Sequence, residues 1–339
     1  MLVVIEDSLR KGAPPMQIFF APMEGLTDAV FRRVHHACFG GVDAYYMPFI
    51  SPTQGLTLNA REKRDLQPEN NAGVTCVPQI LTKDPEHFLW AAGIMAGLGY
   101  TEVDLNAGCP SGTVTAKGKG AGILRQPMAL DDLLEAVCAR SPMPVSVKTR
   151  IAYSDPEEWA KILDVYARYP IRRLIVHPRT CRDRYAPGTV HMECWQAACE
   201  RFPGELVYNG DLFGPDDVTR LLESCPREVG LMLGRGLVAV PSLARTLRGG
   251  APLQKEELAR FHDSLLRELS AVYQPDIVFM KLRVVMKHLE CCFADTGRLA
   301  VEIRHARRLD ELITVDRRLF DTRPLKAEPR FVPDELRSF

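Results

Sequence analysis

A cysteine and an asparagine follow a short strand-like run in a pattern that suggests chemistry. Asn106 ends the run 101–106, and Cys109 comes three residues later, between Gly108 and Pro110. Glycine and proline turn the chain out of the strand at this point, so the thiol is expected on a loop. Loops carried by a rigid scaffold are where catalytic groups concentrate. Cys109 is therefore a candidate catalytic residue, and the alternative is a small loop cysteine with only a packing role.

The elements that would carry such a loop alternate along the chain from residue 17 to about residue 250. Short β-branched or aromatic runs are separated by segments of helical spacing. This alternation predicts parallel strands joined by helices, and eight such units predict an α/β fold, the (β/α)8 TIM barrel. An open doubly wound sheet would need a glycine-rich turn after the first strand, where this chain has Pro22. The predicted strands are 18–21, 42–47, 74–80, 101–106, 145–150, 172–177, 205–209 and 229–233.

Beyond residue 250 the strand signals stop and helical patterns continue at 255–269, 276–289 and 299–313. We therefore predict an N-terminal extension (1–16), a barrel (17–249), a C-terminal helical domain (250–321) and a proline-containing tail (322–339) that runs along the surface. The polar segment 51–73 is expected to cross the barrel mouth.

Composition narrows the possible partners. The formal net charge is zero, so a nucleic-acid partner would have to bind a local cluster of charge. A basic stretch near the C-terminus is either a solvated helix face or a phosphate-binding face, and the sequence leaves both open. Its residues are Arg298, Arg304, Arg307, Arg308, Arg317, Arg318, Arg323, Lys326 and Arg330.

The sequence also bears on location and redox state. Only four apolar residues, 2–5, precede the first acidic residues, which is too few for a signal peptide. No apolar run reaches the length of a membrane span. Ten cysteines without regular spacing are typical of a reducing compartment. We expect a cytoplasmic, monomeric protein without disulfides and without membrane contact.

Polar and conformationally special residues gather at the ends of the predicted strands, where barrel enzymes carry their active sites. A single member has an ordinary structural explanation, but the whole set does not. The members are Pro22, Met23, Gln79, Asn106, Cys109, Lys148, Arg150, His177, Arg179, Asn209, Gly210, Asp211, Gly234 and Arg235.

The seventh and eighth strand ends predict an anion site. Loops at this corner commonly bind phosphate through backbone N–H groups and a helix N-terminus. Gly210, Gly234 and Gly236 allow a close backbone approach, and Arg235 adds a charge-assisted contact. The anion could belong to a phosphorylated substrate or to a cofactor such as flavin mononucleotide (FMN).

Three further side chains bear on that choice. Gln79, Lys148 and His177 suit the hydrogen-bonding edge of an isoalloxazine ring, with Pro22 and Met23 against its flat face. A sugar phosphate could use the same groups, so the residues alone leave both ligands open.

Six motifs together resemble the tRNA-dihydrouridine synthases, flavoenzymes that reduce a uridine in transfer RNA. They occur in family order over residues 17–248 and are far more specific together than one short pattern. The helical region also matches the family's tRNA-binding domain in position and size. The motifs are APMEGLTD (21–28), DLNAGCPS (104–111), SVKTR (146–150), VHPRT (176–180), NGD (209–211) and GRG (234–236).

The resemblance implies FMN as cofactor, NADPH as its reductant and tRNA as partner. It implies that the flavin ring is held by Pro22, Met23, Gln79, Lys148 and His177. It implies that the ribityl phosphate end is held by Asn209, Gly210, Asp211, Gly234 and Arg235. The target uracil would be contacted by Asn106, Arg150 and Arg179.

In the implied reaction the flavin passes hydride from N5 to C6 of uracil, and Cys109 protonates C5. A thiol suits this role because it stays mostly protonated near neutral pH, whereas a carboxylic acid would be ionised. The base must first be turned out of its stack.

Two other functions stay open. A flavin barrel could oxidise or reduce a free pyrimidine, as dihydroorotate dehydrogenases do, with the loop cysteine as base. A non-catalytic tRNA-binding protein could keep the flavin fold without turnover. The helical region disfavours the first of these because a free base needs no such platform.

Some residues depart from the family pattern or carry weaker signals. Residues 46–49 (YMPF) replace a frequent acidic position, Pro178 replaces a frequent glycine, and Lys117 and Lys119 lie in a variable loop. At least two of the aromatic residues Tyr45, Tyr46 and Phe49 are expected to pack in the core. His191, Cys194 and Cys199 do not complete a tetrahedral metal set, so we expect no metal, and Cys291 with Cys292 is expected to pack.

Overall fold

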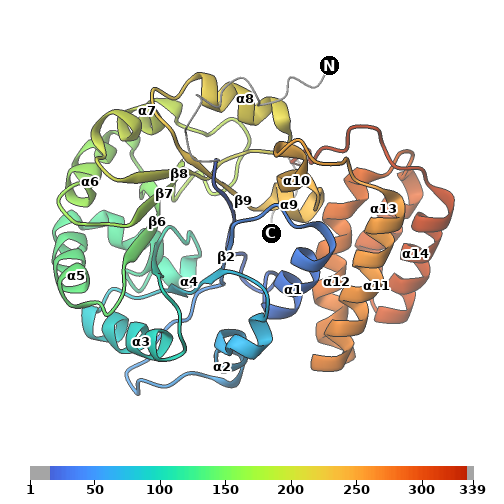
Figure 1. The fold of residues 1–339 in the computed structure, drawn as a ribbon, viewed down its shortest axis with the longest axis horizontal. Helices are drawn as coiled ribbons and strands as arrows, with labels where there is room; N and C mark the ends of the chain where they lie inside the picture. Colours follow the sequence, from blue (N-terminus) through green and yellow to red (C-terminus); the bar gives the residue numbers. More distant parts are fainter. Residues whose placement is uncertain (1–15, 334–339) are drawn as a thin grey trace.

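Nine short parallel strands form the sheet in this computed structural model, which describes residues 16–333. The strands are β1 (Ile18–Phe20), β2 (Ala44–Tyr46), β3 (Cys76–Val77), β4 (Gln79–Ile80), β5 (Val103–Ala107), β6 (Val145–Ala152), β7 (Arg173–Thr180), β8 (Glu205–Tyr208) and β9 (Gly230–Leu233). Their order is β3-β2-β1-β9-β8-β7-β6-β5-β4, so the first and last strands of the chain pair with each other. The sheet curls into a nearly closed barrel (Figure 1), which confirms the predicted TIM-type α/β fold.

The ninth strand arises because Pro78 divides the predicted third strand. Proline has no N–H group, so the sheet ladder is interrupted between β3 and β4. The carbonyl of Pro78 still accepts from the N–H of Asp104 at 2.9 Å. The eight predicted strand positions are therefore all present, and one of them is built from two short pieces.

Helices follow most of the strands and cover the outside of the barrel (Figure 1). They are α1 (Ala29–Phe39), α2 (Ala60–Leu66), α3 (Pro85–Gly97), α4 (Gly112–Thr115), α5 (Pro127–Arg140), α6 (Trp159–Tyr166), α7 (Met192–Arg201), α8 (Pro215–Glu223), α9 (Arg235–Ala239) and α10 (Leu243–Leu247). Local sequence starts several of them. Asp28 accepts from the N–H of Phe31 at the start of α1, and Asp84 accepts from Glu86 at the start of α3. These carboxylates satisfy N–H groups that the helix itself cannot.

The segment 51–73 contains the helix α2, which the sequence analysis did not predict. Asn59 and Glu62 form a capping box at its start. Leu66 is the one buried apolar residue of this seven-residue helix, so the sequence shows no helical periodicity there.

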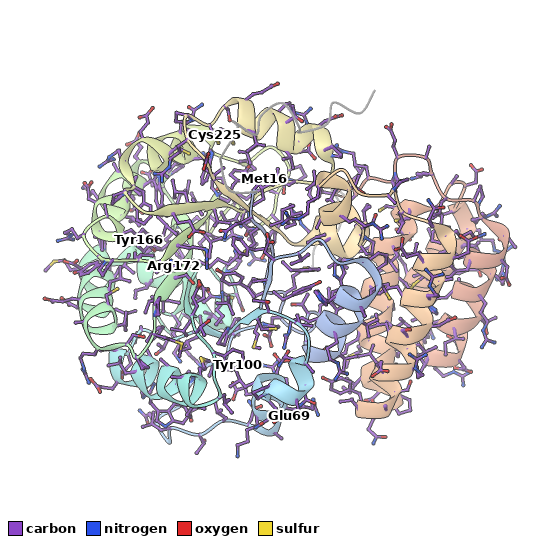
Figure 2. The ribbon with its side chains drawn as sticks, in the orientation of Figure 1. Met16, Glu69, Tyr100, Tyr166, Arg172 and Cys225 are labelled. Atoms are coloured by element: carbon purple, nitrogen blue, oxygen red, sulfur yellow. The ribbon has the colours of Figure 1, made fainter. Side chains whose placement is uncertain are left out.

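Side chains fill the interior of the barrel (Figure 2). An inward-facing cluster from the strands consists of Phe19, Ala21, Ala44, Tyr46, Val77, Ile175, Val207 and Met232. At the N-terminal ends of the strands, Arg173 donates to Glu102 and Glu205, each at 2.6 Å. The barrel is thus a packed core, and a site can open only at the C-terminal ends of its strands.

Four C-terminal helices lie together beside the barrel (Figure 1). They are α11 (Lys255–Val272), α12 (Pro275–Leu289), α13 (Gly297–His305) and α14 (Leu309–Thr322). α11 packs on α1, where the rings of Phe261 and Phe31 meet edge to face with their centres 5.9 Å apart. α12 packs on α9, so these helices contact the barrel next to its first and last units.

The predicted third C-terminal helix, 299–313, is wrong as a single element because the structure breaks it into α13 and α14. Ile303 and Leu312 are both buried. On one continuous helix, residues nine apart are separated by about two and a half turns and face opposite sides. The break at Ala306, whose backbone leaves the helical region, lets both side chains pack inward.

The described part of the tail is anchored on both the C-terminal helical domain and the barrel. Leu325 forms a bridge with Phe293, and Arg330 pairs with Asp217 of α8 at 2.6 Å. The predicted N-terminal extension, apart from its last residue, and tail residues 334–339 lie outside the described residues. Within 16–333, no helix combines the length and apolar character needed to cross a membrane.

Candidate active site

A cavity of about 430 Å³ opens at the C-terminal ends of the strands, a size ordinary for a ligand pocket. It is lined from the ends of β1, β2, β4, β5, β6, β7, β8 and β9 and from α12. All the sequence-predicted site residues except Arg179 line it, namely Pro22, Met23, Gln79, Asn106, Cys109, Lys148, Arg150, His177, Asn209, Gly210, Asp211, Gly234 and Arg235. The structure therefore brings together residues that lie more than 200 positions apart in the chain.

The turn that carries Cys109 is held by Asn106. The Asn106 Oδ1 atom accepts from the N–H groups of Gly108 at 3.0 Å and Cys109 at 2.9 Å. The Cys109 side chain is half-buried, and burial raises the pKa of its thiol. The group is therefore a protonated thiol at neutral pH, suited to donate a proton.

His177 is a neutral imidazole. Burial lowers its pKa well below the usual range, and the charges of Arg150 and Lys148 lower it further. Its Nε2 atom lies 3.1 Å from Nη1 of Arg179. A guanidinium can only donate, so Nε2 accepts and the ring proton resides on Nδ1.

Lys148 and Arg150 bring positive charge to the centre of the cavity. Burial lowers the pKa of Lys148 to about 8, and the neighbouring Arg150 contributes to the same shift. Arg150 donates to the carbonyls of Gly108 at 3.1 Å and Thr180 at 2.7 Å. Its buried Nη2 atom has no hydrogen-bond partner among the described residues. This group can therefore bind an acceptor atom of a ligand.

Arg179 does not line the cavity, so the structure does not support its predicted contact with the substrate. Its side chain is fully buried and donates to Asp211 at 2.6 Å and Thr189 at 3.0 Å. Arg235 donates to the same Asp211 carboxylate at 2.7 Å. Asp211 thus holds two guanidinium groups at the predicted phosphate corner. Its carboxylate would not bind an anion itself but would position these guanidinium groups.

Two glycines at this corner are required by close packing. A Cβ atom at Gly236 would lie 2.4 Å from the carbonyl oxygen of Leu212, and one at Gly210 would lie 2.3 Å from the Tyr208 hydroxyl. No larger residue fits without movement of the backbone or of the buried tyrosine.

Several cavity residues were not predicted. Tyr185, on the loop after β7, has its ring centre 5.9 Å from that of His177 and lies within 5.3 Å of the guanidinium carbons of Arg150 and Arg235. Its position after a strand end was the signal that could have identified it. Val284 and His288 come from α12, and no local sequence pattern links them to the barrel.

The structure places the residues of two departures from the family pattern, segment 46–49 and Pro178. Tyr46 faces the barrel interior and donates to Glu102 at 3.3 Å, and Tyr45 is also buried, as predicted for two of the three aromatic residues. Phe49 lines the cavity. Pro178 lies where the register between β6 and β7 shifts, a bulge that tolerates the missing N–H group.

The other cysteine and histidine residues singled out in the sequence form no metal site within the described part of the chain. His191 contacts Asp183 and Glu193, each at 3.2 Å, and the described residues contain no group of three or more metal-ligating side chains. Cys291 and Cys292 both donate to the carbonyl of Ala239. All ten cysteines are free thiols.

A cationic cavity and a protonated thiol lie at the C-terminal mouth of a nearly closed parallel barrel, where barrel enzymes carry their active sites. Two solved structures share the fold: morphinone reductase (TM-score 0.51, 13% identity, covering 72% of this chain and 88% of that chain) and a 2-naphthoyl-CoA reductase complex (TM-score 0.51, 10% identity, covering 70% and 50%). At these identities the likeness shows the fold alone.

Sequence comparison shows the family. The dihydrouridine synthase (Dus) family model matches residues 19–315. The tRNA-dihydrouridine(16) synthase of Aquipseudomonas alcaligenes is 31% identical over 88% of this chain and 99% of its own length. That of Pseudomonas putida is 30% identical over 90% and 99%, and a probable tRNA-dihydrouridine synthase of Staphylococcus epidermidis is 31% identical over 96% and 99%. The chain belongs to the dihydrouridine synthase family, whose members are oxidoreductases, and this membership supports a flavin cofactor.

Proposed function

We propose that this protein is a tRNA-dihydrouridine synthase that uses FMN and NADPH to reduce the C5–C6 bond of a uridine in tRNA. The observation that carries the proposal is the protonated Cys109 thiol at the edge of a cationic cavity. Relatives named for position 16 align over nearly the whole chain, so uridine 16 is the first position to examine.

The cavity fits a flavin by its chemistry. Lys148, the free Nη2 donor of Arg150 and the neutral His177 offer hydrogen-bond donors to the polar edge of a ring. Pro22 and Met23 offer an apolar surface, and Arg235 offers a cation for a phosphate. A bound flavin, once reduced by NADPH, would supply the hydride for C6 of uracil.

Cys109 would supply the proton for C5. Its Sγ–H bond breaks, the proton passes to C5, and the resulting thiolate is reprotonated from solvent before the next cycle. The cations Lys148 and Arg150 lie close enough to lower the pKa of the thiol, and both favour the thiolate that is left after transfer. Burial opposes them, which keeps the proton on sulfur beforehand.

A second cavity, of about 560 Å³, supports an RNA substrate. It lies between the barrel and the C-terminal helices and shares five lining residues with the first cavity, Glu24, Leu26, Pro48, Phe49 and Val284. A base turned out of an RNA lying in this cleft could therefore enter the flavin site directly. We propose that residues 250–321 serve as the tRNA-binding domain.

Three lysines near the Cys109 turn, called here the lysine rim, also favour a polyanion. Lys83 and Lys117 are exposed, and burial together with their charges lowers the pKa of Lys119. Lys119 donates to Ser51 at 3.1 Å, which joins the Cys109 side of the rim to the loop after β2. These lysines are suited to RNA phosphates.

The C-terminal basic stretch fits a solvated helix face better. Five of its residues pair with acidic side chains: Arg298, Arg304, Arg308, Arg318 and Arg330. Their charge is largely compensated, so the cleft and the lysine rim are the better RNA surface.

The function is tested by mapping dihydrouridine in tRNA from cells with and without the gene. We expect the modification to be lost at one or more positions, uridine 16 first, and restored by a plasmid copy. Unchanged tRNA would contradict the proposal. Turnover of free pyrimidines by the purified protein without RNA would instead support the small-molecule alternative. We further propose a cytoplasmic monomer, which fractionation and light scattering can test.

Lys148 provides a pH-dependent prediction. Its pKa of about 8 means that the ammonium is charged below that pH and neutral above it. A charge-assisted hydrogen bond contributes about 1.5–3 kcal/mol, so we expect FMN affinity to fall about tenfold or more between pH 7 and pH 9.5. Fluorescence titration of the flavin-free protein measures this. Lys148→Arg, charged throughout the range, should show no such decline, and an equal decline in that variant would exclude Lys148 as its cause.

A further inference from the structure

A chain of buried hydrogen bonds runs from the barrel interior to the Cys109 turn. The Gln79 Nε2 atom donates to Asp104 Oδ2 at 2.7 Å. The Asn106 Nδ2 atom donates to Gln79 Oε1 at 2.8 Å, and Asn106 Oδ1 accepts from the N–H groups of Gly108 and Cys109. Asp104, Gln79 and Asn106 are all buried, with exposed fractions of 0%, 1% and 8%.

The direction of every bond in this chain is determined by its two ends. The N–H groups of Gly108 and Cys109 can only donate, so Asn106 must present its oxygen to them and its nitrogen to Gln79. Gln79 must then present its oxygen to Asn106 and its nitrogen to the third member. That member must accept, and the carboxylate of Asp104 does so.

A reversed Gln79 amide would set its NH2 group against the NH2 group of Asn106. Reversal of Asn106 as well would set an NH2 group against the two backbone N–H groups of the turn. Each arrangement leaves buried donors unpaired, at about 1–3 kcal/mol for each group. The acceptor at the interior end therefore stabilises one orientation of both amides.

Strand register explains how Asp104 reaches this position. Asp104 pairs with Gln79 between β4 and β5, and Asp104 and Asn106 lie two residues apart on one face of β5. A fully buried carboxyl group is costly, and burial raises the pKa of Asp104 to about 7. An apolar residue would be enough for packing alone. The carboxyl group at this site therefore points to a hydrogen-bonding role.

We propose that Asp104 is a positioning residue, which orients the Gln79 and Asn106 amides and thereby holds the Cys109 turn in the geometry for proton transfer. Asp104 does not line the cavity, so it acts through the other two side chains. The proposal rests on the proposed function of Cys109.

The test uses two variants. The first removes the donor of the Gln79–Asp104 hydrogen bond, and the second restores that bond with donor and acceptor exchanged. In Gln79→Glu, two carboxyl groups face each other, and a proton shared between them would imitate the original bond. The assays are therefore run well above the Asp104 pKa of about 7, where both groups are ionised and the link to Asp104 is lost. In the double variant Gln79→Glu with Asp104→Asn, the introduced asparagine can donate to the introduced glutamate, which still accepts from Asn106. Displacement of a reacting group by about 1 Å can cost about 100-fold, so we expect kcat of Gln79→Glu to fall about 100-fold, with a much smaller change in the KM for tRNA. The double variant should recover at least about tenfold of this loss.

The matched control is Gln79→Glu with Glu24→Gln. It removes one negative charge from the same cavity but offers the introduced glutamate no donor at the Asp104 position. It should stay as slow as Gln79→Glu. Equal recovery in this control, or no recovery in the Asp104 double variant, would overturn the proposal.

A measurement that needs no tRNA tests the positioning role of Asp104 separately from the proposed tRNA reduction. Iodoacetamide labelling of the flavin-bound protein, with Cys109 followed by mass spectrometry, reports how firmly the turn is held. We expect faster labelling in Gln79→Glu and a return toward the wild-type rate in the double variant. Equal labelling rates in all variants would overturn the positioning role, even if the wild type reduces tRNA. Absence of tRNA reduction in the wild type, with the labelling order as expected, would instead contradict the proposed function.

Discussion

Replacement of Cys109 by alanine should lower the rate of dihydrouridine formation by about 100- to 10,000-fold, the usual contribution of a general acid. The half-buried thiol is protonated at neutral pH because burial raises its pKa. Alanine leaves no proton donor at this point of the cavity. Single-turnover assays with the reduced holoenzyme and tRNA measure the loss at the chemical step.

The same variant should keep its flavin and its tRNA. Cys109 contributes its backbone N–H to Asn106, and alanine retains that group. Flavin absorbance and filter binding should therefore match the wild type within about twofold, which corresponds to less than about 0.5 kcal/mol. Cys138→Ala removes another partly buried thiol, on α5 away from the cavity, and should keep full activity. A Cys109→Ala enzyme with a normal single-turnover rate would remove this thiol from the mechanism.

Replacement of Asp211 by asparagine should destabilise the flavin-free protein by about 3 kcal/mol. Arg179 is fully buried and Arg235 largely so, and both donate to the Asp211 carboxylate. Removal of one partner from a buried ion pair leaves an uncompensated charge, which costs about 3–5 kcal/mol, and the partial exposure of Asp211 favours the lower figure. Urea unfolding of the flavin-free protein measures the change.

FMN should restore more stability to Asp211→Asn than it adds to the wild type. Its phosphate would supply the negative charge that the two arginines have lost. Asp216→Asn, on the exposed face of α8, is the matched control and should change unfolding by less than about 0.5 kcal/mol. An equal FMN effect on wild type and Asp211→Asn would show that the phosphate does not meet this arginine pair.

Local sequence patterns predicted much of the barrel, because the apolar run of a strand and the glycine or proline of a turn each lie within a few neighbouring residues. Alternation of short apolar runs identified all eight strand positions, and glycine or proline marked where several strands end. The same reasoning missed α2, which buries only one apolar side chain, and joined α13 to α14. Both errors arise because helix phase and helix ends depend on what each face packs against.

The sequence by itself determined most of the residues at the barrel mouth, since the carboxyl ends of parallel strands meet at one face whatever the side chains are. Only the tertiary structure decided what each of them does there. Arg179 turns away to hold Asp211, and Asn106 holds the Cys109 turn while Gln79 connects it to Asp104. Hydrogen-bond partners depend on the register between neighbouring strands and on the direction in which each group can donate. The spacing of residues along the chain predicts neither of these.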